Sequence, residues 1–353
     1  MMPLLLGDPS PSLRWRAAIE LYGATNDDDE VKAWRTAIET DAEVQSLLTR
    51  LATMRDDPKG AGYVLCQLAY LGYEGPELAP AVEAVFTHQE PDGSWPYWRD
   101  DDPDLSKTKP KPRRRKDSVA PDAFGAEPYT VLTMTTLVPL RGIAAAGFAT
   151  DPRAERAYDW LVDQRLDDGS WTGSHRGGYG FDFRSGPTGS GDPDYRRLTR
   201  GRGCRSATTG AVACLALHPE RSRSEAARVG VDHLLARETH DAATLGWEVS
   251  RLVGLQAAGG NFTFYVQFDH AFLLDLASRC GVSPDDRRAR ELVAYLETLR
   301  GPYGLWQHPA HPQLSRWLTF DLECSLRRLA EGDWVGNEEP AAFTPYKKGR
   351  RRY

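Results

Sequence analysis

The chain has 353 residues, a formal net charge of −6 at pH 7 and a hydrophobic content of 41%. An acidic chain has no overall attraction to nucleic acid or to an anionic membrane, and no apolar run reaches the roughly 20 residues of a membrane-spanning helix. The five cysteines form no Cys-x-x-Cys pair, which favours a reduced, cytoplasmic setting. The apolar opening at 1–6 has no basic flank, so we expect no secretory signal.

Helical patterns occur along most of the chain, first at 10–22 and 28–51 and then in pairs. The predicted pairs are 60–71 with 77–88, 129–146 with 153–164, 207–217 with 224–237, and 266–278 with 284–299, followed by a closing helix at 315–329. The first member of each pair is short and richly apolar, and the second is amphipathic. We therefore predict an all-α fold of paired inner and outer helices, because only the amphipathic helices have a face suited to solvent.

Four tryptophans mark the ends of similar phrases. Trp95 closes Gln-Glu-Pro-Asp-Gly-Ser-Trp, and Trp171 closes Gln-Arg-Leu-Asp-Asp-Gly-Ser-Trp. Trp171 lies 76 residues after Trp95, Trp247 lies 76 residues after Trp171, and Trp306 lies 59 residues after Trp247. This spacing indicates one unit copied several times, with the third copy reduced to Gly-Trp and the fourth to Tyr-Gly-Leu-Trp.

A repeat that runs through most of the chain predicts a single domain at 1–353 with one core. Within it we distinguish N-terminal helices at 1–54, repeats at 55–330 and a C-terminal tail at 331–353. Two long loops interrupt the repeats at 99–126 and 173–203; the first has an acidic run and then a basic run, and the second is rich in Gly, Arg, Asp and aromatic residues. Loops of this length are usually functional lids or disordered segments.

The phrase Gln-x-x-Asp-Gly-Ser-Trp before an apolar helix resembles the QW motif of the terpenoid cyclase and protein prenyltransferase superfamily, which includes squalene-hopene cyclase-like proteins. The resemblance covers roughly residues 55–330 and implies an α/α toroid in which Trp and Gln join consecutive helix pairs and Asp-Gly forms a tight turn. Segments 11–15 and 315–319 are similar to short, single-toroid bacterial members of unassigned activity. The resemblance therefore implies a scaffold and no particular reaction.

The reactions of this superfamily require motifs that the chain lacks. A class II terpenoid cyclase uses Asp-x-Asp-Asp as its acid, whereas the acidic stretches here, at 27–30 and 100–104, fit a helix start and a solvated loop. The Asp-x-Cys of a prenyltransferase zinc site is also missing. Although Cys204, Asp269 and His270 could converge in space, buried Cys and His are more often structural, so we expect neither a metal nor another cofactor.

We therefore select candidate site residues by their place in the predicted fold. The inner helices of a toroid surround a central cavity, and the mouth of this cavity lies at the helix starts. Asp269 and His270 interrupt an apolar inner helix and are the main candidates for acid–base catalysis, with Asp182 in the second loop as a further acid. The candidate substrate-binding residues are Tyr129, Tyr179, Phe181, Arg205, Tyr265, Gln267, Trp317 and Asp321.

Each of these assignments has a structural alternative. Adjacent helical residues point about 100° apart, so Asp269 and His270 can each bond a different neighbouring helix without forming a site. Arg113, Arg114 and Arg115 in the first loop are candidates for binding a diphosphate or another anion, and the alternative is a solvated loop.

Two hypotheses of function follow. In the first, a cytoplasmic, metal-independent toroid holds a largely apolar, isoprenoid-like small molecule and cyclises or isomerises it by protonation, with Asp269 or Asp182 as the acid and aromatic side chains stabilising a cation. In the second, the toroid is a non-catalytic binding or scaffold protein for an anionic ligand or a protein partner. Neither hypothesis involves nucleic acid, and the oligomeric state is left open.

Overall fold

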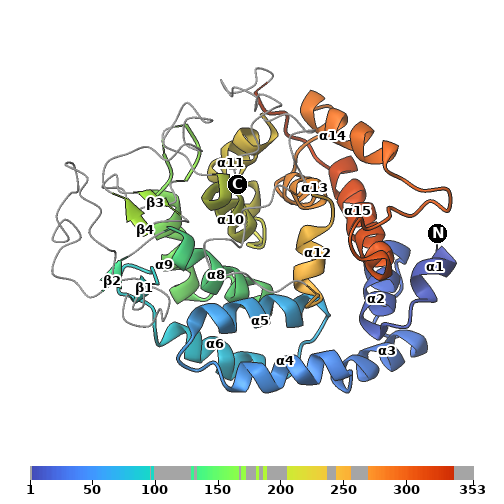
Figure 1. The fold of residues 1–353 in the computed structure, drawn as a ribbon, viewed down its shortest axis with the longest axis horizontal. Helices are drawn as coiled ribbons and strands as arrows, with labels where there is room; N and C mark the ends of the chain where they lie inside the picture. Colours follow the sequence, from blue (N-terminus) through green and yellow to red (C-terminus); the bar gives the residue numbers. More distant parts are fainter. Residues whose placement is uncertain are drawn as a thin grey trace.

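The regular structure in the described part of the chain is mostly helix, so the predicted all-α fold class is confirmed (Figure 1). The computed structural model describes residues 2–95, 97–98, 129–130, 133–166, 168–171, 180–182, 186–188, 205–236, 244–255 and 269–337. The loop 99–126 and most of the loop 173–203 lie outside these residues, as does the tail beyond residue 337. None of the described helices combines the length and the apolar character that crossing a membrane would need.

Six inner helices bury residues on most of their faces. They are α2 (Pro11–Arg16), α5 (Pro58–Tyr70), α8 (Thr133–Ile143), α10 (Arg205–Leu215), α13 (His270–Arg279) and α15 (Ser315–Ala330). Every residue of α8 is buried, and eight consecutive residues of α5 are buried between Ala61 and Leu68. The sequences of α5, α8 and α10 explain this position, because they consist largely of small and apolar residues on all sides.

Six outer helices bury one face only. They are α3 (Asp29–Glu39), α4 (Ala42–Ala52), α6 (Leu78–Phe86), α9 (Pro152–Asp163), α11 (Glu225–Leu235) and α14 (Arg287–Thr298). In α9, for example, the buried residues Ala154, Ala157, Tyr158 and Leu161 recur every three or four positions, which places them on one stripe of the helix. These helices therefore differ from the inner helices in burying a single stripe of residues.

The helices contact one another in a closed circuit. Contacts join α2 to α3, α3 to α4, α4 to α5, α5 to α8, α8 to α10, α10 to α11, α11 to α13 and α13 to α15. The circuit closes where α15 contacts α1 (Met2–Leu6) and η1 (Ala17–Leu21), the π-helical continuation of α2. Figure 1 shows the same course around the molecule, with α15 in red beside α1 and α2 in blue.

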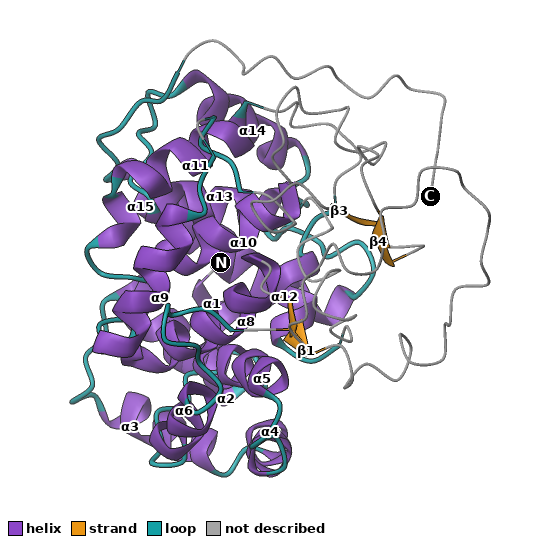
Figure 2. Cartoon of the chain, turned by 90° about the vertical axis from the view of Figure 1, so that its left-hand side faces the viewer, coloured by secondary structure: helices purple, strands orange, loops and turns teal. Residues whose placement is uncertain are grey.

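The remaining elements are short. Two antiparallel strand pairs, β1 (Tyr97–Trp98) with β2 (Tyr129–Thr130) and β3 (Gly180–Asp182) with β4 (Gly186–Thr188), lie on one side of the helices (Figure 2). The other short helical turns are η3 (Ala144–Phe148), η5 (Arg221–Arg223) and η7 (Pro312–Leu314).

Four predicted helix boundaries are wrong. The helix predicted at 266–278 begins only at His270, because Asp269 is its N-cap. The single helix predicted at 28–51 is two helices, because the side chain of Asp41 accepts the N–H groups of the residues two and three positions later and caps α4. The helix predicted to start at 284 starts three residues later, where Asp286 is the N-cap of α14. The helix predicted at 129–146 begins only at Thr133, because Tyr129 belongs to strand β2.

A helix that was not predicted, α12 (Trp247–Leu252), packs against α5. It follows Gly246, whose φ of 77° lies in the left-handed region that favours glycine, and all its residues except Trp247 are buried. Trp247 is half-buried, and its indole nitrogen makes no hydrogen bond to the part of the chain that the structure describes. The interpretation of Gly-Trp at this position as a third repeat copy is therefore wrong.

The other three tryptophans share one arrangement. Trp95, Trp171 and Trp306 are fully buried, and each indole nitrogen donates to a backbone carbonyl ten residues earlier, at the end of an outer helix, over 3.0, 2.7 and 2.8 Å. Each backbone N–H of these tryptophans donates to a threonine hydroxyl near the start of an inner helix. These tryptophans therefore join consecutive helix pairs, as predicted.

The turn before each of the first two tryptophans also has the predicted form. Gly93 and Gly169 have φ values of 96° and 81°, and a Cβ at Gly93 would lie only 2.5 Å from a backbone carbonyl oxygen of α9. Only glycine fits this turn without displacing the backbone. The amide of Gln89 donates to the carbonyl of Arg153 in α9 over 2.9 Å, which ties the first copy to the second.

Candidate functional site

Asp269, the main acid predicted from the sequence, is the N-cap of α13. Its Oδ1 accepts the backbone N–H groups of Gly246 and Ala271, each over 3.0 Å, and its Oδ2 accepts the N–H of Glu248 over 2.8 Å. Burial raises the pKa of the Asp269 carboxyl to about 6, and the backbone N–H groups oppose this shift. Because both oxygens hold backbone groups of α12 and α13, the geometry matches the structural alternative considered above.

His270 lies beside Asp269 in sequence but contacts a different part of the molecule. Its ring is buried and meets the ring of Tyr295 edge to face, with the ring centroids 5.0 Å apart. Tyr295 belongs to the outer helix α14, so His270 is turned toward the outside of the circuit. The structure does not bring Asp269 and His270 together on one substrate-facing surface.

The other predicted residues fall into two groups. Tyr179, Tyr265, Gln267 and Arg113–Arg115 lie outside the described residues. Tyr129 lies in β2, Phe181 and Asp182 lie in β3, Arg205 is the first residue of α10, and Trp317 and Asp321 lie in α15.

Trp317 and Asp321 are brought together with Tyr70, a residue that the sequence did not indicate. The rings of Tyr70 and Trp317 stack, with centroids 5.2 Å apart and planes inclined by 30°. The Tyr70 hydroxyl donates to Oδ2 of Asp321 over 2.8 Å. This hydrogen bond connects the last residue of α5 to α15.

Further charged side chains surround this pair. We call the following seven residues the interior cluster: Arg16, Glu20, Tyr70, Asp275, Arg279, Asp321 and Arg328. Arg16 donates to Glu20 from Nε over 2.7 Å and to the carbonyl of Tyr70 from Nη1 over 3.2 Å. Its guanidinium also lies over the Tyr70 ring, 4.8 Å from the centroid. Arg16 therefore contacts both the acidic and the aromatic part of the cluster.

Asp275 binds the other two arginines of the interior cluster. Nε of Arg279, one turn later on α13, donates to both Asp275 oxygens over 2.9 and 3.0 Å, and Nη2 of Arg328 on α15 donates to Oδ1 over 2.6 Å. Nε of Arg328 also donates to the hydroxyl of Ser278 over 3.3 Å. Asp275 thus holds α13 and α15 together through two charge-assisted contacts.

The three carboxyl groups of the interior cluster differ in their proton affinity. Burial raises the pKa of Asp321 to about 7 against the opposing charge of Arg16, and the negative charge of Asp275 adds to the increase. For Glu20, burial is outweighed by Arg16, and for Asp275 it is outweighed by the two arginines that it binds, so both pKa values lie below the usual range. At neutral pH the cluster therefore holds two carboxylates and one carboxyl group that exchanges its proton.

A second group of polar residues surrounds α12. Glu248 accepts from Nη1 of Arg141 over 2.6 Å and lies 3.2 Å from Nη1 of Arg251, and all three side chains are buried. Tyr63 and Gln67 of α5 donate to the carbonyl oxygen of Arg251 over 2.8 and 3.0 Å. Buried charges need such partners, since removing one partner leaves the other uncompensated. This group fixes α12 against α5 and α8.

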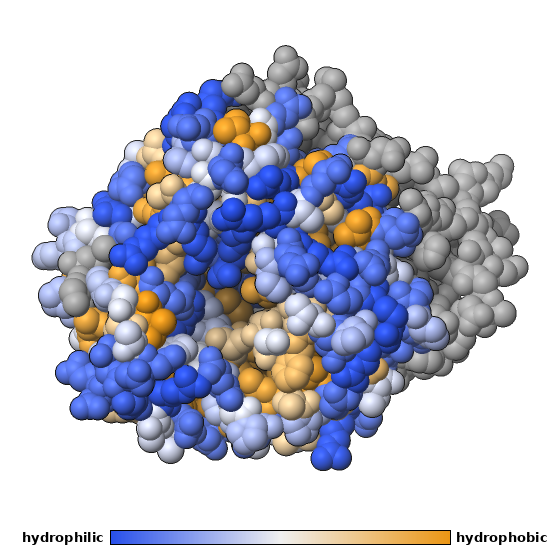
Figure 3. Space-filling view, turned by 180° about the vertical axis from the view of Figure 1, so that it is seen from behind, coloured by the Kyte–Doolittle hydropathy of each residue, from blue (hydrophilic) through white to orange (hydrophobic). Residues whose placement is uncertain are grey.

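The interior cluster and the residues around α12 lie close to each other. The charge of Arg141 helps to lower the pKa of Asp275, and its guanidinium lies 5.1 Å from the centre of the Phe272 ring on α13. Solvent reaches the interior cluster, because the side chains of Arg279, Arg328 and Asp275 are 31%, 29% and 22% exposed. Figure 3 shows a hollow near the middle of the face opposite to that of Figure 1, with apolar residues inside it and hydrophilic residues around its rim.

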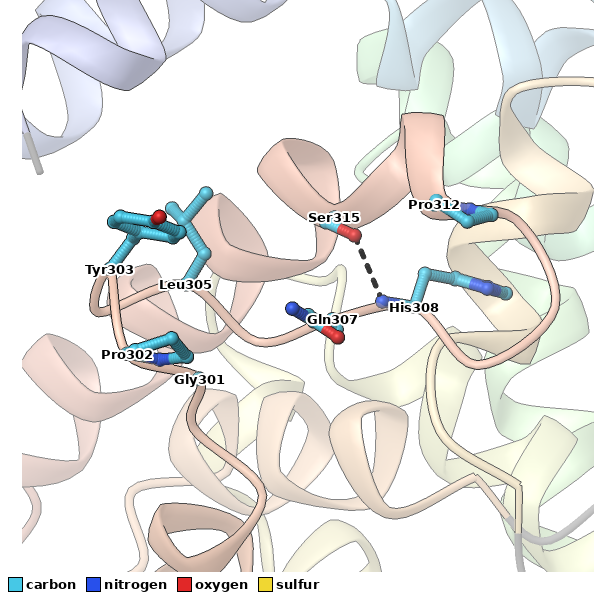
Figure 4. Close-up of a pocket in the computed structure, with 8 residues that line it drawn as sticks. All are labelled: Gly301, Pro302, Tyr303, Leu305, Gln307, His308, Pro312 and Ser315. Carbon is cyan, nitrogen blue, oxygen red and sulfur yellow. Dashed lines mark hydrogen bonds between the residues drawn. The ribbon is translucent and has the colours of Figure 1, made fainter.

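A pocket of about 270 Å³ lies elsewhere, in the connection between α14 and α15 (Figure 4). Its lining residues are Gly301, Pro302, Tyr303, Leu305, Gln307, His308, Pro312 and Ser315. Nδ1 of His308 accepts the N–H groups of Ala310 and His311, and Nε2 lies 2.9 Å from the carbonyl oxygen of Gly246. Both ring nitrogens therefore hold the backbone, and we do not assign the functional site here.

A pattern in the sequence does indicate residues of the interior cluster. It is the spacing of opposite charges, whereas the candidate residues were selected by their position at the helix starts. Arg16 of α2 with Glu20 of η1, and Asp275 with Arg279 of α13, are pairs of opposite charge four residues apart. Charged residues at such spacing share one face of a helix. Most of α13 is buried, so a pair of this kind indicates polar side chains inside the molecule.

Among the residues that the structure describes, no three His, Cys, Asp or Glu side chains gather as ligands of one metal ion. No protein-family model matches the chain, and no curated protein is significantly similar to it in sequence.

Proposed function

We propose that the chain is an α/α toroid that binds a small molecule in the interior of its ring, and that Asp321 exchanges a proton with this molecule. The observation that carries the proposal is the pKa of about 7 for a carboxyl group that is hydrogen-bonded to Tyr70 beside the Trp317 ring. A general acid–base group is most effective when its pKa lies near the working pH. The closed circuit of inner and outer helices supports the toroid.

The same pKa favours one class of reaction over another. Protonation of an isolated alkene, as in an acid-initiated terpenoid cyclase, requires a strong acid. A carboxyl group with a pKa near 7 is suited to move a proton to or from an oxygen, or a carbon next to a carbonyl group. We therefore favour an isomerase-type proton transfer over alkene cyclisation, with Asp321 in place of Asp269 and Asp182 as the acid.

Deuterium exchange tests the proposal even though the substrate is unidentified. The purified protein is incubated in D₂O with a mixture of small metabolites, and deuterium incorporation at carbon is followed by mass spectrometry. We expect at least one metabolite to gain deuterium with the wild type and not with Asp321→Asn. Asp285→Asn, at an exposed position next to α14, is the matched control and should behave as the wild type. Equal incorporation by wild type and Asp321→Asn would refute the role of Asp321.

A non-catalytic binding protein is the second candidate function. It is favoured by the arginines of the interior cluster, which suit an anionic ligand whether or not that ligand reacts. Native mass spectrometry of the purified protein would reveal a retained ligand. A retained molecule that gains no deuterium in the exchange experiment supports binding alone.

A further inference from the structure

Arg279 has unused hydrogen-bond donors and lies near Arg16 and Glu20 of the interior cluster. Its Nε donates to Asp275, whereas its two terminal nitrogens donate to no atom in the part of the chain that the structure describes. The side chain is 31% exposed, so these terminal nitrogens are accessible. The guanidinium plane carries its N–H groups as a fork that matches the two oxygens of a carboxylate.

The charges of the interior cluster leave room for one negative charge. Three arginines face two carboxylates, Glu20 and Asp275, which are held in the ionised form by those arginines. The third acid, Asp321, binds the Tyr70 hydroxyl and none of the arginines directly. As long as Asp321 keeps its proton, the cluster has an excess of one positive charge. A monovalent anion would balance this charge, whereas a diphosphate would bring excess negative charge next to Glu20 and Asp275.

The aromatic side chain of Phe272 lies on the same side of α13 as Arg279. Phe272, Asp275 and Arg279 are spaced by three and four residues, so they form one stripe along the helix. Phe272 is half-buried, and its ring lies against the Arg141 guanidinium in the interior. The stacked rings of Tyr70 and Trp317 are the other aromatic groups at the interior cluster. A ligand along this stripe would meet the Phe272 ring, then Asp275 with the arginines that neutralise it, and then the terminal nitrogens of Arg279.

We propose that Arg279 binds the carboxylate of an amphiphilic small molecule whose apolar part lies along the α13 stripe toward Phe272. This assignment rests on the proposed binding of a small molecule inside the ring, and it adds the chemical class of that molecule. The carboxylate would take two hydrogen bonds from the terminal nitrogens of Arg279 while Asp275 continues to hold Nε.

The test is calorimetric titration of the purified full chain with three eight-carbon probes. Octanoate carries the carboxylate, octanamide has nearly the same shape without the charge, and octyl phosphate carries a different anionic head. We expect octanoate to bind more tightly than octanamide and octyl phosphate. Arg279→Gln should weaken octanoate binding by about 10- to 100-fold, because charge-assisted hydrogen bonds contribute about 1.5–3 kcal/mol, and should leave octanamide binding unchanged.

Two controls keep the result interpretable. Arg290→Gln changes an exposed arginine on the outer helix α14 and should leave octanoate binding as in the wild type. Folding of Arg279→Gln is checked by its unfolding midpoint, and it should persist because Arg328 still binds Asp275. Equal weakening of octanoate and octanamide, tighter binding of octyl phosphate, or no octanoate binding by the wild type would each overturn the assignment.

The outcome is separate from that of the proton-transfer proposal. Octanoate binding is an equilibrium measurement that requires no reaction, and the deuterium experiment requires no octanoate. Retained deuterium exchange without octanoate binding would leave Asp321 as the acid and remove Arg279 as the carboxylate site. Octanoate binding without exchange would do the reverse.

Discussion

The starts of the inner helices and the interior cluster are both buried, polar regions, and they differ in what their polar groups bind. At the starts, the tryptophan N–H groups and the Asp269 carboxylate bind backbone groups and threonine hydroxyls. In the interior cluster, side chains bind other side chains, and several remain partly accessible to solvent. A polar group that satisfies the backbone stabilises the fold, whereas accessible polar side chains are available to a ligand.

This comparison separates repeated from unrepeated residues. The tryptophan arrangement occurs three times with the same ten-residue spacing to its carbonyl acceptor. The interior cluster occurs once and draws its side chains from α2, η1, α5, α13 and α15. A feature that recurs between successive helices stabilises the packing that these helices share. The unrepeated cluster is where specific chemistry is to be expected.

The largest predicted effect concerns the tryptophan junctions. Trp171→Ala removes a fully buried ring and its hydrogen bond to the carbonyl of Leu161, so we expect a loss of about 3–5 kcal/mol in the free energy of unfolding. Trp247→Ala is the matched control, because this ring is half-buried and should cost less than about 2 kcal/mol. Urea denaturation measures both. Similar losses for the two variants would show that Trp171 has no special role as a junction.

The second prediction tests Asp269 as a structural cap. In Asp269→Asn an amide NH₂ replaces one carboxylate oxygen, and it must face a backbone N–H that the oxygen now accepts. One buried N–H is left without an acceptor, and we expect this to cost about 1–3 kcal/mol. The raised pKa of Asp269 makes its charge unfavourable in the folded state, so the loss should be largest at pH 5, where the carboxyl is mostly protonated in the wild type, and smaller at pH 7.5. Urea denaturation measures it, with Asp285→Asn as control. A stability equal to that of the wild type would contradict the cap and favour the catalytic role.

The sequence predicted the parts of the fold that depend on local pattern. Apolar inner helices and amphipathic outer helices followed from periodicity, and Trp95, Trp171 and Gly93 followed from a repeated phrase with a defined turn. The helix α12 was not predicted, because six residues that are buried on nearly every side carry no amphipathic period. Trp247 was misassigned because its 76-residue spacing matched the repeat although its surroundings do not.

The candidate site was predictable only in part. Trp317 and Asp321 were identified from their position on the last inner helix, but their partner Tyr70 lies 251 residues from Asp321 in sequence. No local pattern relates two residues so far apart, since the closure of the circuit brings them together. The sequence also could not show whether Asp269 is a catalytic acid or a helix cap. A polar residue at the start of an apolar helix has the same pattern whether it caps the helix or faces a cavity.

The third prediction tests the pKa of Asp321. In the unfolded chain this carboxyl has a pKa of about 3.8, and in the folded protein about 7, so the folded state keeps a proton that the unfolded state loses as the pH rises through this window. Stability from this group therefore falls between pH 4 and 7. Asn has no such penalty, so Asp321→Asn should be more stable than the wild type by about 1–2 kcal/mol at pH 8, allowing for partial solvent screening.

The measurement is urea denaturation of wild type and Asp321→Asn at pH 5, 6.5 and 8. The difference between the two proteins should grow with pH, because the other titrating groups contribute equally to both. Asp285→Asn should show a difference near zero at every pH. A constant difference between wild type and Asp321→Asn would mean that Asp321 titrates as an ordinary solvated carboxyl group, which would remove the basis for its role in proton transfer.

The smallest predicted effect distinguishes the hydrogen bond of Tyr70 from its ring stacking. Tyr70→Phe removes the hydroxyl that donates to Asp321 and keeps a ring against Trp317, so we expect a loss of about 1 kcal/mol or less at pH 8. The loss should be smaller at pH 5, because a hydrogen bond to an ionised acceptor is stronger than one to a neutral acceptor. Combining Tyr70→Phe with Asp321→Asn should make the loss independent of pH. A loss that keeps its pH dependence in the double variant would show that the Tyr70 hydroxyl acts on a group other than Asp321.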